Sequence, residues 1–496
     1  MTSDIEMSES APSTGRVDGR VKDGDDKGIG QEKQLGIFPK LTEKLMKYDI
    51  ETHGITPIPV EHRTETRTHQ FFWLWFSVNF NILTFIPGSA GPAFFGLGLK
   101  SSLLTILVVD LLAIFGPKLG TYGMVQCRFS WGLWGSVIPS ILNVFSSQGF
   151  LILNCIIGGQ TLAATSNKLD DTLGIGIIGV ISLVVCFCGY RVIHWFENYA
   201  WVPSVITFPI LLGLAGKHLN SSTMPSAPAS SPAMILSFAS FLSAGAISWC
   251  TVTPDYGVYH DSKASSVKMF VYAYLGFVLP CLAWQMLGAA LAAAALGIPS
   301  WQSGFDGGNN MGGLLDVVLS PAGGFGKFVL VIIALSTSCG CAPTMYTFGT
   351  SFMSIHPFFA RVPRYIFAII SEALLIHLAM VGARTFYNTL VDIVSVIGYW
   401  STAIVLVEHL YFRKCRFSSC DISTWDKASL LPPGIAAVLA FCGSFGIIVP
   451  SMQQTWYTRP IAKAATGDIG IFTGAAVAAL LYFVLRYVEK RIRPGR

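Results

Sequence analysis

The first apolar stretch of the chain, residues 71–99, carries polar and helix-breaking residues suited to binding a small molecule or an ion. They are Asn81, Thr84, Gly88 and Ser89, together with the breaks at Pro87-Gly88 and Gly91-Pro92. In hydrocarbon, the backbone groups that a break frees are costly unless protein or water satisfies them. We therefore expect the break to face a cavity, as in transporters whose broken helices form a substrate or ion site. The alternative is a kinked helix whose polar residues are satisfied by neighbouring helices.

The same architecture predicts a second broken helix about five helices later. Residues 233–259 fit this expectation, because Gly245 and Pro254 bracket a run that contains Ser248, Trp249, Thr251 and Thr253. The two breaks together predict a site lined by segments far apart in the chain.

Carboxylates also lie in apolar segments, where an ionisable side chain is by default a functional hypothesis. They are Asp110, Glu372 and Asp392 within predicted helices and Asp255 just after the second break. We predict Asp110 and Asp255 as coupling or gating residues. An ion pair with the nearby Lys263 or Lys268 explains Asp255 equally well. Glu408 and His409, beside Arg413 and Lys414 at the cytosolic end of the tenth helix, are expected to fix the interface. None of these acids selects a proton over a sodium ion.

The composition predicts a polytopic membrane protein. Of the 496 residues, 52% are hydrophobic and only 12% are charged, and the mean hydropathy is +0.56, which lies outside the range of soluble globular proteins. The basic residues are scattered, so we expect no nucleic-acid partner. The cysteines are mostly in apolar segments without a histidine cluster, so we expect no metal site and no enzyme. No Walker-type phosphate-binding run is present, which disfavours an ATPase.

Twelve apolar segments, each near the roughly 20 residues that a bilayer requires, predict an all-α fold with twelve transmembrane helices. We place them at about 71–98, 101–117, 132–164, 173–190, 199–216, 233–254, 268–297, 325–350, 363–382, 387–411, 431–450 and 468–488. Connections on one side of this arrangement hold most of the Lys and Arg residues of the loops, which places both termini in the cytosol.

Several motifs stand in order along the chain from Gly54 onward. They are GITPIPVEHRTETR (54–67), WFSVNFN in the first helix, FGPKLGTYGMVQCRFSWG (115–132), NCIIGGQ (154–160), SWCTVTPDYGVYH (248–260) and IGYWSTAIVLVEHLYFRK (397–414). Together they resemble the fungal purine-cytosine permease family of nucleobase-cation symporters. The resemblance implies proton-driven uptake of cytosine, adenine, hypoxanthine, guanine or a similar planar heterocycle across the plasma membrane, with vitamin B6 as the substrate of one relative.

The resemblance also implies two inverted five-helix repeats, with broken first and sixth helices, and two further helices. The expected organisation is a cytosolic N-terminal tail over 1–70, disordered and then amphipathic, the first repeat over 71–216, an external linker over 217–232, the second repeat over 233–411, a cytosolic loop over 412–430, helices 11 and 12 over 431–488 and a cytosolic tail over 489–496.

A planar base needs an aromatic face for stacking and a few polar groups at its edge. Phe150 and Asn154 are four residues apart and share one face of the third helix, where the resemblance suggests a family Trp at the first position and an Asn at the second. Gln160 lies farther along this helix. Trp249 matches the Trp of the family's sixth-helix motif and is the expected second stacking partner.

The eighth helix departs from the family pattern. Where relatives carry two adjacent Asn, one residue, Pro-Asn and then Tyr-Ser, this chain reads Gly340-Cys341-Ala342-Pro343-Thr344-Met345-Tyr346-Thr347. We include Cys341, Pro343 and Thr344 in the predicted site. Because the three amides are missing, a vitamin B6-like or other heterocycle is the alternative cargo, and a non-transporting substrate sensor is a third possibility. We expect no cofactor besides a co-transported proton, and as partners the lipid bilayer and a possible homo-oligomer.

Overall fold

The computed structural model describes residues 54–112, 121–187, 190–219, 229–382, 400–416, 419–454, 457–458 and 460–493. These ranges are helical, as expected, apart from one antiparallel pair of two-residue strands, β1 (Gln453–Gln454) and β2 (Tyr457–Thr458). This pair lies in the connection between the last two helices, and the all-α prediction is confirmed. Asp392, most of the predicted tail 1–70 and parts of the linker 217–232 lie outside the described residues.

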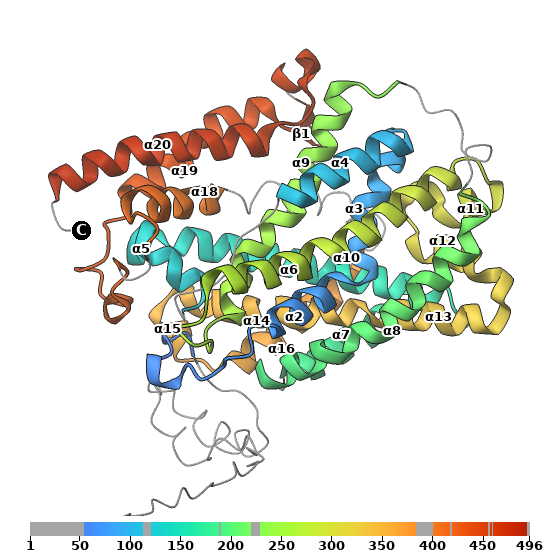
Figure 1. Ribbon diagram of the computed structural model, residues 1–496, viewed down its shortest axis with the longest axis horizontal. Helices are drawn as coiled ribbons and strands as arrows, with labels where there is room; N and C mark the ends of the chain where they lie inside the picture. The colour runs from blue at the N-terminus through green and yellow to red at the C-terminus, as the bar shows by residue number, and fades with distance from the viewer. Residues whose placement is uncertain are drawn as a thin grey trace, which may run out of the picture.

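The helices form an elongated bundle of long, roughly parallel elements, with the C-terminal helices gathered along one edge (Figure 1). Their bounds are α2 (Gln70–Asn79), α3 (Ile82–Ala93), α4 (Leu99–Leu112), α5 (Gly123–Gly135), α6 (Val137–Ala163), α7 (Asp171–Phe187), α8 (Tyr190–Gly216), α9 (Pro232–Ser248), α10 (Ser266–Ala295), α11 (Pro299–Phe305), α12 (Met311–Leu319), α13 (Gly323–Leu335), α14 (Thr337–Ile355), α15 (Pro357–Ala360), α16 (Arg364–Gly382), α18 (Trp400–Val407), α19 (Ile435–Ser451) and α20 (Gly470–Ile492).

Six helical stretches among the described residues are long and apolar enough to cross a membrane, or seven if α2 and α3 count as one bent span. Other predicted spans correspond to shorter helices: α19, for example, has 17 residues. The tenth predicted span, 387–411, is described only from Trp400 onward. The count of twelve and the inverted repeats therefore stay predictions.

The first apolar stretch is broken, but not at the predicted residues. The bend of 54° lies between α2 and α3, at Phe80 and Asn81, whereas Pro87 and Pro92 are inside α3. Asn81 is extended, and its side chain replaces the missing helical bonds: Oδ1 accepts from the N–H groups of Leu83 (2.8 Å) and Thr84 (3.3 Å). An amide cap of this kind lets α3 begin inside the protein without unsatisfied donors.

The second predicted break is a change of helix type. α9 ends at Ser248 and continues as two 3-10 turns, Trp249–Thr251 and Thr253–Tyr256. Two other predicted helices are also divided. The third is split into α5 and α6 at Ser136, and the eighth into α13 and α14 at Ser336.

The centre of the bundle is built around α14, α6 and α10. Almost every side chain of α14 is buried, and α14 packs against α6, α7 and α16, while α10 packs against α2, α3 and α4. Glycines permit the closest approach. A Cβ added at Gly88 would overlap the carbonyl of Gln285, and one added at Gly288 would overlap that of Phe85. Helices that approach this closely leave little freedom for α3 to shift along α10.

The segment before α2 is attached to the turn after the second break. Glu65 and His260 form an isolated parallel bridge, with the N–H of Glu65 donating to Tyr259 and that of Asp261 donating to Glu65. Burial lowers the pKa of His260 to about 4, so its ring is neutral at physiological pH. Burial opposes ionisation of Glu65, but hydrogen bonds and charge from Arg67 outweigh it and lower the Glu65 pKa.

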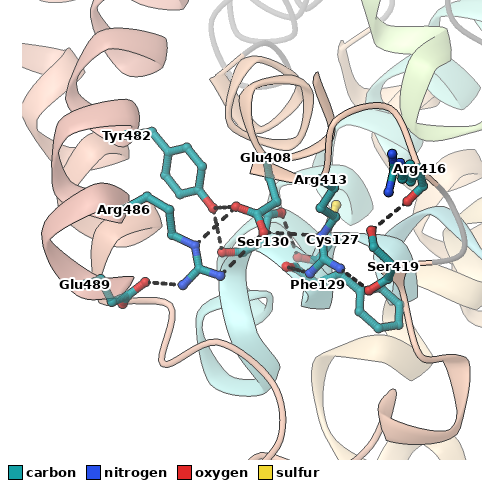
Figure 2. Close-up of polar contacts among 10 residues, drawn as sticks. All are labelled: Cys127, Phe129, Ser130, Glu408, Arg413, Arg416, Ser419, Tyr482, Arg486 and Glu489. Carbon is teal, nitrogen blue, oxygen red and sulfur yellow. Dashed lines mark hydrogen bonds and ion pairs between the residues drawn. The ribbon is translucent and has the colours of Figure 1, made fainter. Parts of the chain in front are cut away.

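A buried ion-pair cluster joins α20 to the end of α18 (Figure 2). Glu408, 3% exposed, accepts from Arg486 Nε at 3.2 Å and from the Tyr482 hydroxyl at 2.9 Å. Arg413 Nε lies 3.3 Å from the other Glu408 oxygen, as the sequence suggested, and Arg486 also pairs with Glu489 at 2.7 Å. The partners on α20 were not anticipated, because they lie 74 to 81 residues away in the chain.

We expect Arg486→Met to destabilise the protein strongly. The substitution leaves Glu408 buried beside fewer positive charges, and breaking a buried pair costs roughly 3–5 kcal/mol. Arg491 is the matched control, because it lies on the same helix but is exposed and hydrogen-bonds the Tyr487 hydroxyl at 2.8 Å. Thermal unfolding in detergent should show a much lower midpoint for Arg486→Met and little change for Arg491→Met. Equal midpoints would mean that the cluster does not stabilise the fold.

Candidate functional site

A cavity of about 100 Å³ lies beside the break between α2 and α3. Its polar lining residues are Asn79, Asn81, Thr84, Asp110, Cys281 and Gln285. Its aromatic lining residues are Phe150, Phe241, Trp249 and Phe277. Among the described residues, no Lys, Arg or His lines it. The cavity is therefore an aromatic chamber with polar groups and one carboxylate, which suits a small planar polar ligand.

The two predicted residues at the start of α3 both line this cavity. Asn81 is committed to the cap described above, so it shapes the cavity wall more than it offers free hydrogen-bonding groups. Thr84, one turn on, lines the cavity as well.

Gly88 and Ser89, also predicted, do not line the cavity. Gly88 lies against the backbone of Gln285. Ser89 donates to the Ile86 carbonyl at 2.9 Å and lies 3.8 Å from the Met311 sulfur. Both residues support packing around α3 in this structure.

The three predicted residues of α6 lie in three different environments. Phe150 lines the cavity. Asn154 is buried, does not line the cavity and donates to the Phe150 carbonyl at 3.0 Å, while its Oδ1 atom has no hydrogen-bond partner among the described residues. That oxygen would lie 3.1 Å from a Cβ added at Gly340, which does line the cavity. Gln160 lies elsewhere and donates to the carbonyl of Asn309 at 3.3 Å.

Trp249 follows α9 and faces the cavity together with Phe150. Its ring packs edge-on against Trp75 of α2, with 5.7 Å between the ring centroids. This contact holds the indole at the point where the two broken segments meet. The cavity thus has aromatic groups from α6 and from the turn after α9, the two elements in which stacking partners were predicted.

α14 contributes only Gly340 to the cavity wall. Cys341, Pro343 and Thr344 are buried within the bundle, and the Thr344 hydroxyl donates to the Gly340 carbonyl at 2.7 Å. At this wall α14 therefore presents backbone and no polar side chain. The polar contacts available to a ligand come from other helices.

Asp110 of α4 lines the cavity opposite Gln285, a residue that was not predicted from the sequence. Gln285 of α10 hydrogen-bonds Asp110, and Asn79 of α2 accepts from the Cys281 thiol at 3.8 Å nearby. The signal for Gln285 was present in the sequence, since it is a lone amide in the middle of the apolar stretch 268–297. The criterion that selected Asp110 considers only ionisable side chains, so it passes over this amide.

Asp255 has a different environment and does not line the cavity. One carboxylate oxygen accepts from the Gly123 N–H at 2.7 Å and the other from the Thr350 hydroxyl at 2.7 Å. These bonds tie the turn after α9 to α5 and α14. Two further buried acids, Glu372 on α16 and Glu197 on α8, also lie away from the cavity, and Glu197 was not singled out from the sequence.

A second and larger cavity, of about 270 Å³, lies between α5, the turn after α9 and the end of α18. Its charged lining residues, Glu408 and Arg413, already belong to the ion-pair cluster. None of the predicted site residues lines it. Within the described part of the chain, no three His, Cys, Asp or Glu side chains gather to hold a metal ion. The smaller cavity is therefore the better candidate for ligand binding.

Comparison with known proteins gives consistent matches over most of the chain. The family described as permeases for cytosine/purines, uracil, thiamine and allantoin matches residues 57–429. The purine-cytosine permease fcyB of Emericella nidulans is 32% identical, over 91% of each chain. The purine-cytosine permease FCY2 of Saccharomyces cerevisiae is 30% identical, over 92% of this chain and 89% of the relative.

One further relative and one solved structure extend the comparison. The vitamin B6 transporter TPN1 of Saccharomyces cerevisiae is 26% identical, over 91% of this chain and 89% of the relative. The nucleobase-cation-symport-1 family transporter Mhp1, solved in a closed conformation with bromovinylhydantoin bound, has a TM-score of 0.64 at 15% identity, covering 89% of this chain and 96% of that one. The last match shows that the fold is shared.

Two glycines at this site should respond in opposite ways to alanine. At Gly88 the added methyl group would meet the Gln285 backbone, whereas at Gly245, which lines the cavity, nothing lies within 4 Å. We expect Gly88→Ala to cost about 1–3 kcal/mol through overpacking and Gly245→Ala to be neutral or slightly stabilising. Thermal unfolding in detergent measures both, and an unchanged midpoint for Gly88→Ala would contradict the packing.

Proposed function

We propose, from the premise that this chain belongs to the family of permeases for cytosine/purines, uracil, thiamine and allantoin, that it is a proton-coupled importer of a nucleobase. The chain is a membrane protein with several apolar helices, and its family consists of transporters. The nucleobase, the proton and the direction of transport are the proposed parts.

The observation that carries this proposal is the cavity at the break between α2 and α3. A heterocycle stacked between Phe150 and Trp249 would place its edge near Thr84 and Asp110, beside the wall that Asn81 shapes. Stacking is tolerant of ring identity because every base has a π-face, and the polar groups then decide which edge is accepted. This division of roles fits a carrier of planar polar rings.

Alternating access follows from how the segments at the break are held. α3 is fixed to α10 by close glycine contacts, while the turn after α9 is held to α5 and α14 through Asp255. Two groups of helices attached on different sides of one cavity can move relative to each other without unfolding. We assign Asp255 to this gating contact and Asp110, which lines the cavity, to coupling.

The proposed setting is the plasma membrane, with both termini in the cytosol. The distribution of Lys and Arg among the connections supports this orientation through the positive-inside rule. No cofactor besides the co-transported proton is needed for such a mechanism. The proposed partners are the substrate, the lipid bilayer and a second copy of this chain.

A second candidate cargo is a vitamin B6-like or other substituted heterocycle. The observation in its favour is the wall formed by α14, where Gly340 lines the cavity without contributing a side chain. The similarity to the vitamin B6 transporter TPN1 is consistent with this candidate. Pyridoxine therefore belongs in any substrate panel.

Uptake in cells that lack their own permeases tests the function. We expect saturable accumulation of radiolabelled cytosine or adenine that a protonophore abolishes. Accumulation of pyridoxine alone would establish the second candidate, whereas binding without net flux would identify a sensor. Recovery of chemically altered substrate would identify an enzyme and overturn the proposal.

Truncating the stacking residues should weaken substrate binding without harming the fold. We expect Phe150→Ala and Trp249→Ala each to raise the KM for uptake about 5-fold or more, because a base–aromatic stack contributes roughly 1–3 kcal/mol. Trp195→Ala is the control, since Trp195 is 65% exposed on α8. Kinetics normalised to surface expression provide the measurement, and equal effects at all three positions would exclude a specific stacking role.

A further inference from the structure

Two polar side chains on the wall formed by α4 and α10 have hydrogen-bonding capacity that the protein does not use. Asp110 is 1% exposed and Gln285 is 7% exposed, and both line the cavity. Gln285 hydrogen-bonds Asp110, but Asp110 Oδ2 and Gln285 Oε1 have no hydrogen-bond partner in the described part of the chain. The Gln285 amide nitrogen is therefore the donor and Asp110 Oδ1 the acceptor. The two remaining oxygens are available to a ligand in the cavity.

Among the described residues, no positively charged group neutralises Asp110. On α3 and α9, which pack against α4, the sequence contains no titratable side chain. On α10 the facing titratable groups are the Cys281 thiol, which also lines the cavity, and Tyr274, whose hydroxyl donates to the Leu111 carbonyl at 2.9 Å. An ionised carboxylate without a counter-charge is costly at this depth, so Asp110 requires a proton or a ligand that supplies donors.

The position of Gln285 is rigid. Its backbone carbonyl lies against Gly88 of α3, and one turn later Gly288 lies against the Phe85 carbonyl. These contacts fix the position of Gln285 along α10 relative to the break. Gln285 in turn orients Asp110. A preorganised pair of this kind recognises an edge of fixed geometry better than mobile side chains do.

We propose that Asp110 and Gln285 form a base-recognition subsite in which the coupling proton and the substrate share one carboxyl group. This inference rests on the proposed function and specifies its substrate class, a ring with an amidine edge such as cytosine or adenine. An amidine edge presents a ring nitrogen that accepts and an exocyclic amino group that donates. A protonated carboxyl group matches this pattern with two parallel hydrogen bonds.

In the proposed cycle, one proton crosses the membrane with each base. A proton from the outer solution binds Asp110, and its O–H donates to the ring nitrogen while Oδ1 accepts one hydrogen of the amino group. On the inner side the base leaves, the proton is released to water, and Asp110 returns as a carboxylate. Substrate binds well only when the proton is present, because the ionised carboxylate offers the ring nitrogen no donor.

Gln285 supplies the selectivity. Its free Oε1 can accept the second hydrogen of the exocyclic amino group, which a lactam base such as uracil or hypoxanthine does not possess. A buried acceptor left without a partner is penalised, so we expect cytosine and adenine to bind about 10-fold more tightly than uracil and hypoxanthine. The recognition that α14 lacks would thus come from α4 and α10.

The decisive substitution is Asp110→Asn in the full-length protein reconstituted in proteoliposomes. An asparagine amide reproduces the donor and acceptor of the neutral carboxyl group but cannot release a proton. We expect Asp110→Asn to keep counterflow exchange of radiolabelled cytosine while losing accumulation driven by a pH gradient. Asp110→Leu should lose both. Glu372→Gln is the matched control, because Glu372 is a buried acid away from the cavity, and it should retain both activities.

The outcomes separate this inference from the proposed function. If the wild-type protein neither exchanges nor accumulates any heterocycle, the proposed function fails. If it accumulates cytosine and Asp110→Asn still does so in response to a pH gradient, the function stands and the shared subsite is wrong. Should Asp110→Asn not fold, Gln285→Met provides the test: it should remove the preference for cytosine over uracil, and an unchanged preference would overturn the inference.

Discussion

The structure depends on how one interruption in a transmembrane helix is satisfied. Between α2 and α3 the backbone turns by 54°, and in an apolar bundle each freed N–H group needs a partner. Asn81 supplies it by accepting from Leu83 and Thr84. Because a residue of the break itself satisfies these donors, the surrounding space remains open for a ligand. The cavity, its aromatic walls and the buried acid beside it are all arranged around this point.

Close packing by small residues determines which groups reach the cavity. Gly88 and Gly288 bring α3 and α10 together and place Gln285 opposite Asp110. On the other side, α14 has Gly340 at the wall, while Cys341 and Thr344 are directed into the bundle. The polar groups that line the chamber therefore come mainly from the break between α2 and α3, from α4 and from α10.

The C-terminal helices are attached to the rest of the protein by charge as well as by apolar packing. The family match ends at residue 429, before α19 and α20 begin. Arg486 and Tyr482 of α20 nevertheless reach Glu408, and Arg413 next to Glu408 donates to the Phe129 carbonyl of α5 at 2.9 Å. A buried ion pair of this kind contributes specificity of position at a desolvation cost. It fixes α20 against α5 and the end of α18.

Composition and local pattern by themselves determined that this is a helical membrane protein with an interrupted first span, and motif order identified its family. Hydrophobic periodicity and helix-breaking residues are local features, so they can be recognised in the sequence alone. The bend at Asn81 instead of Pro87, the pairing of Asp110 with Gln285 and the engagement of Asp255 by Gly123 and Thr350 were decided only by the tertiary structure. Each of these joins residues distant in the chain or depends on a side chain that competes with backbone hydrogen bonds. Only the packed helices determine which partner is within reach.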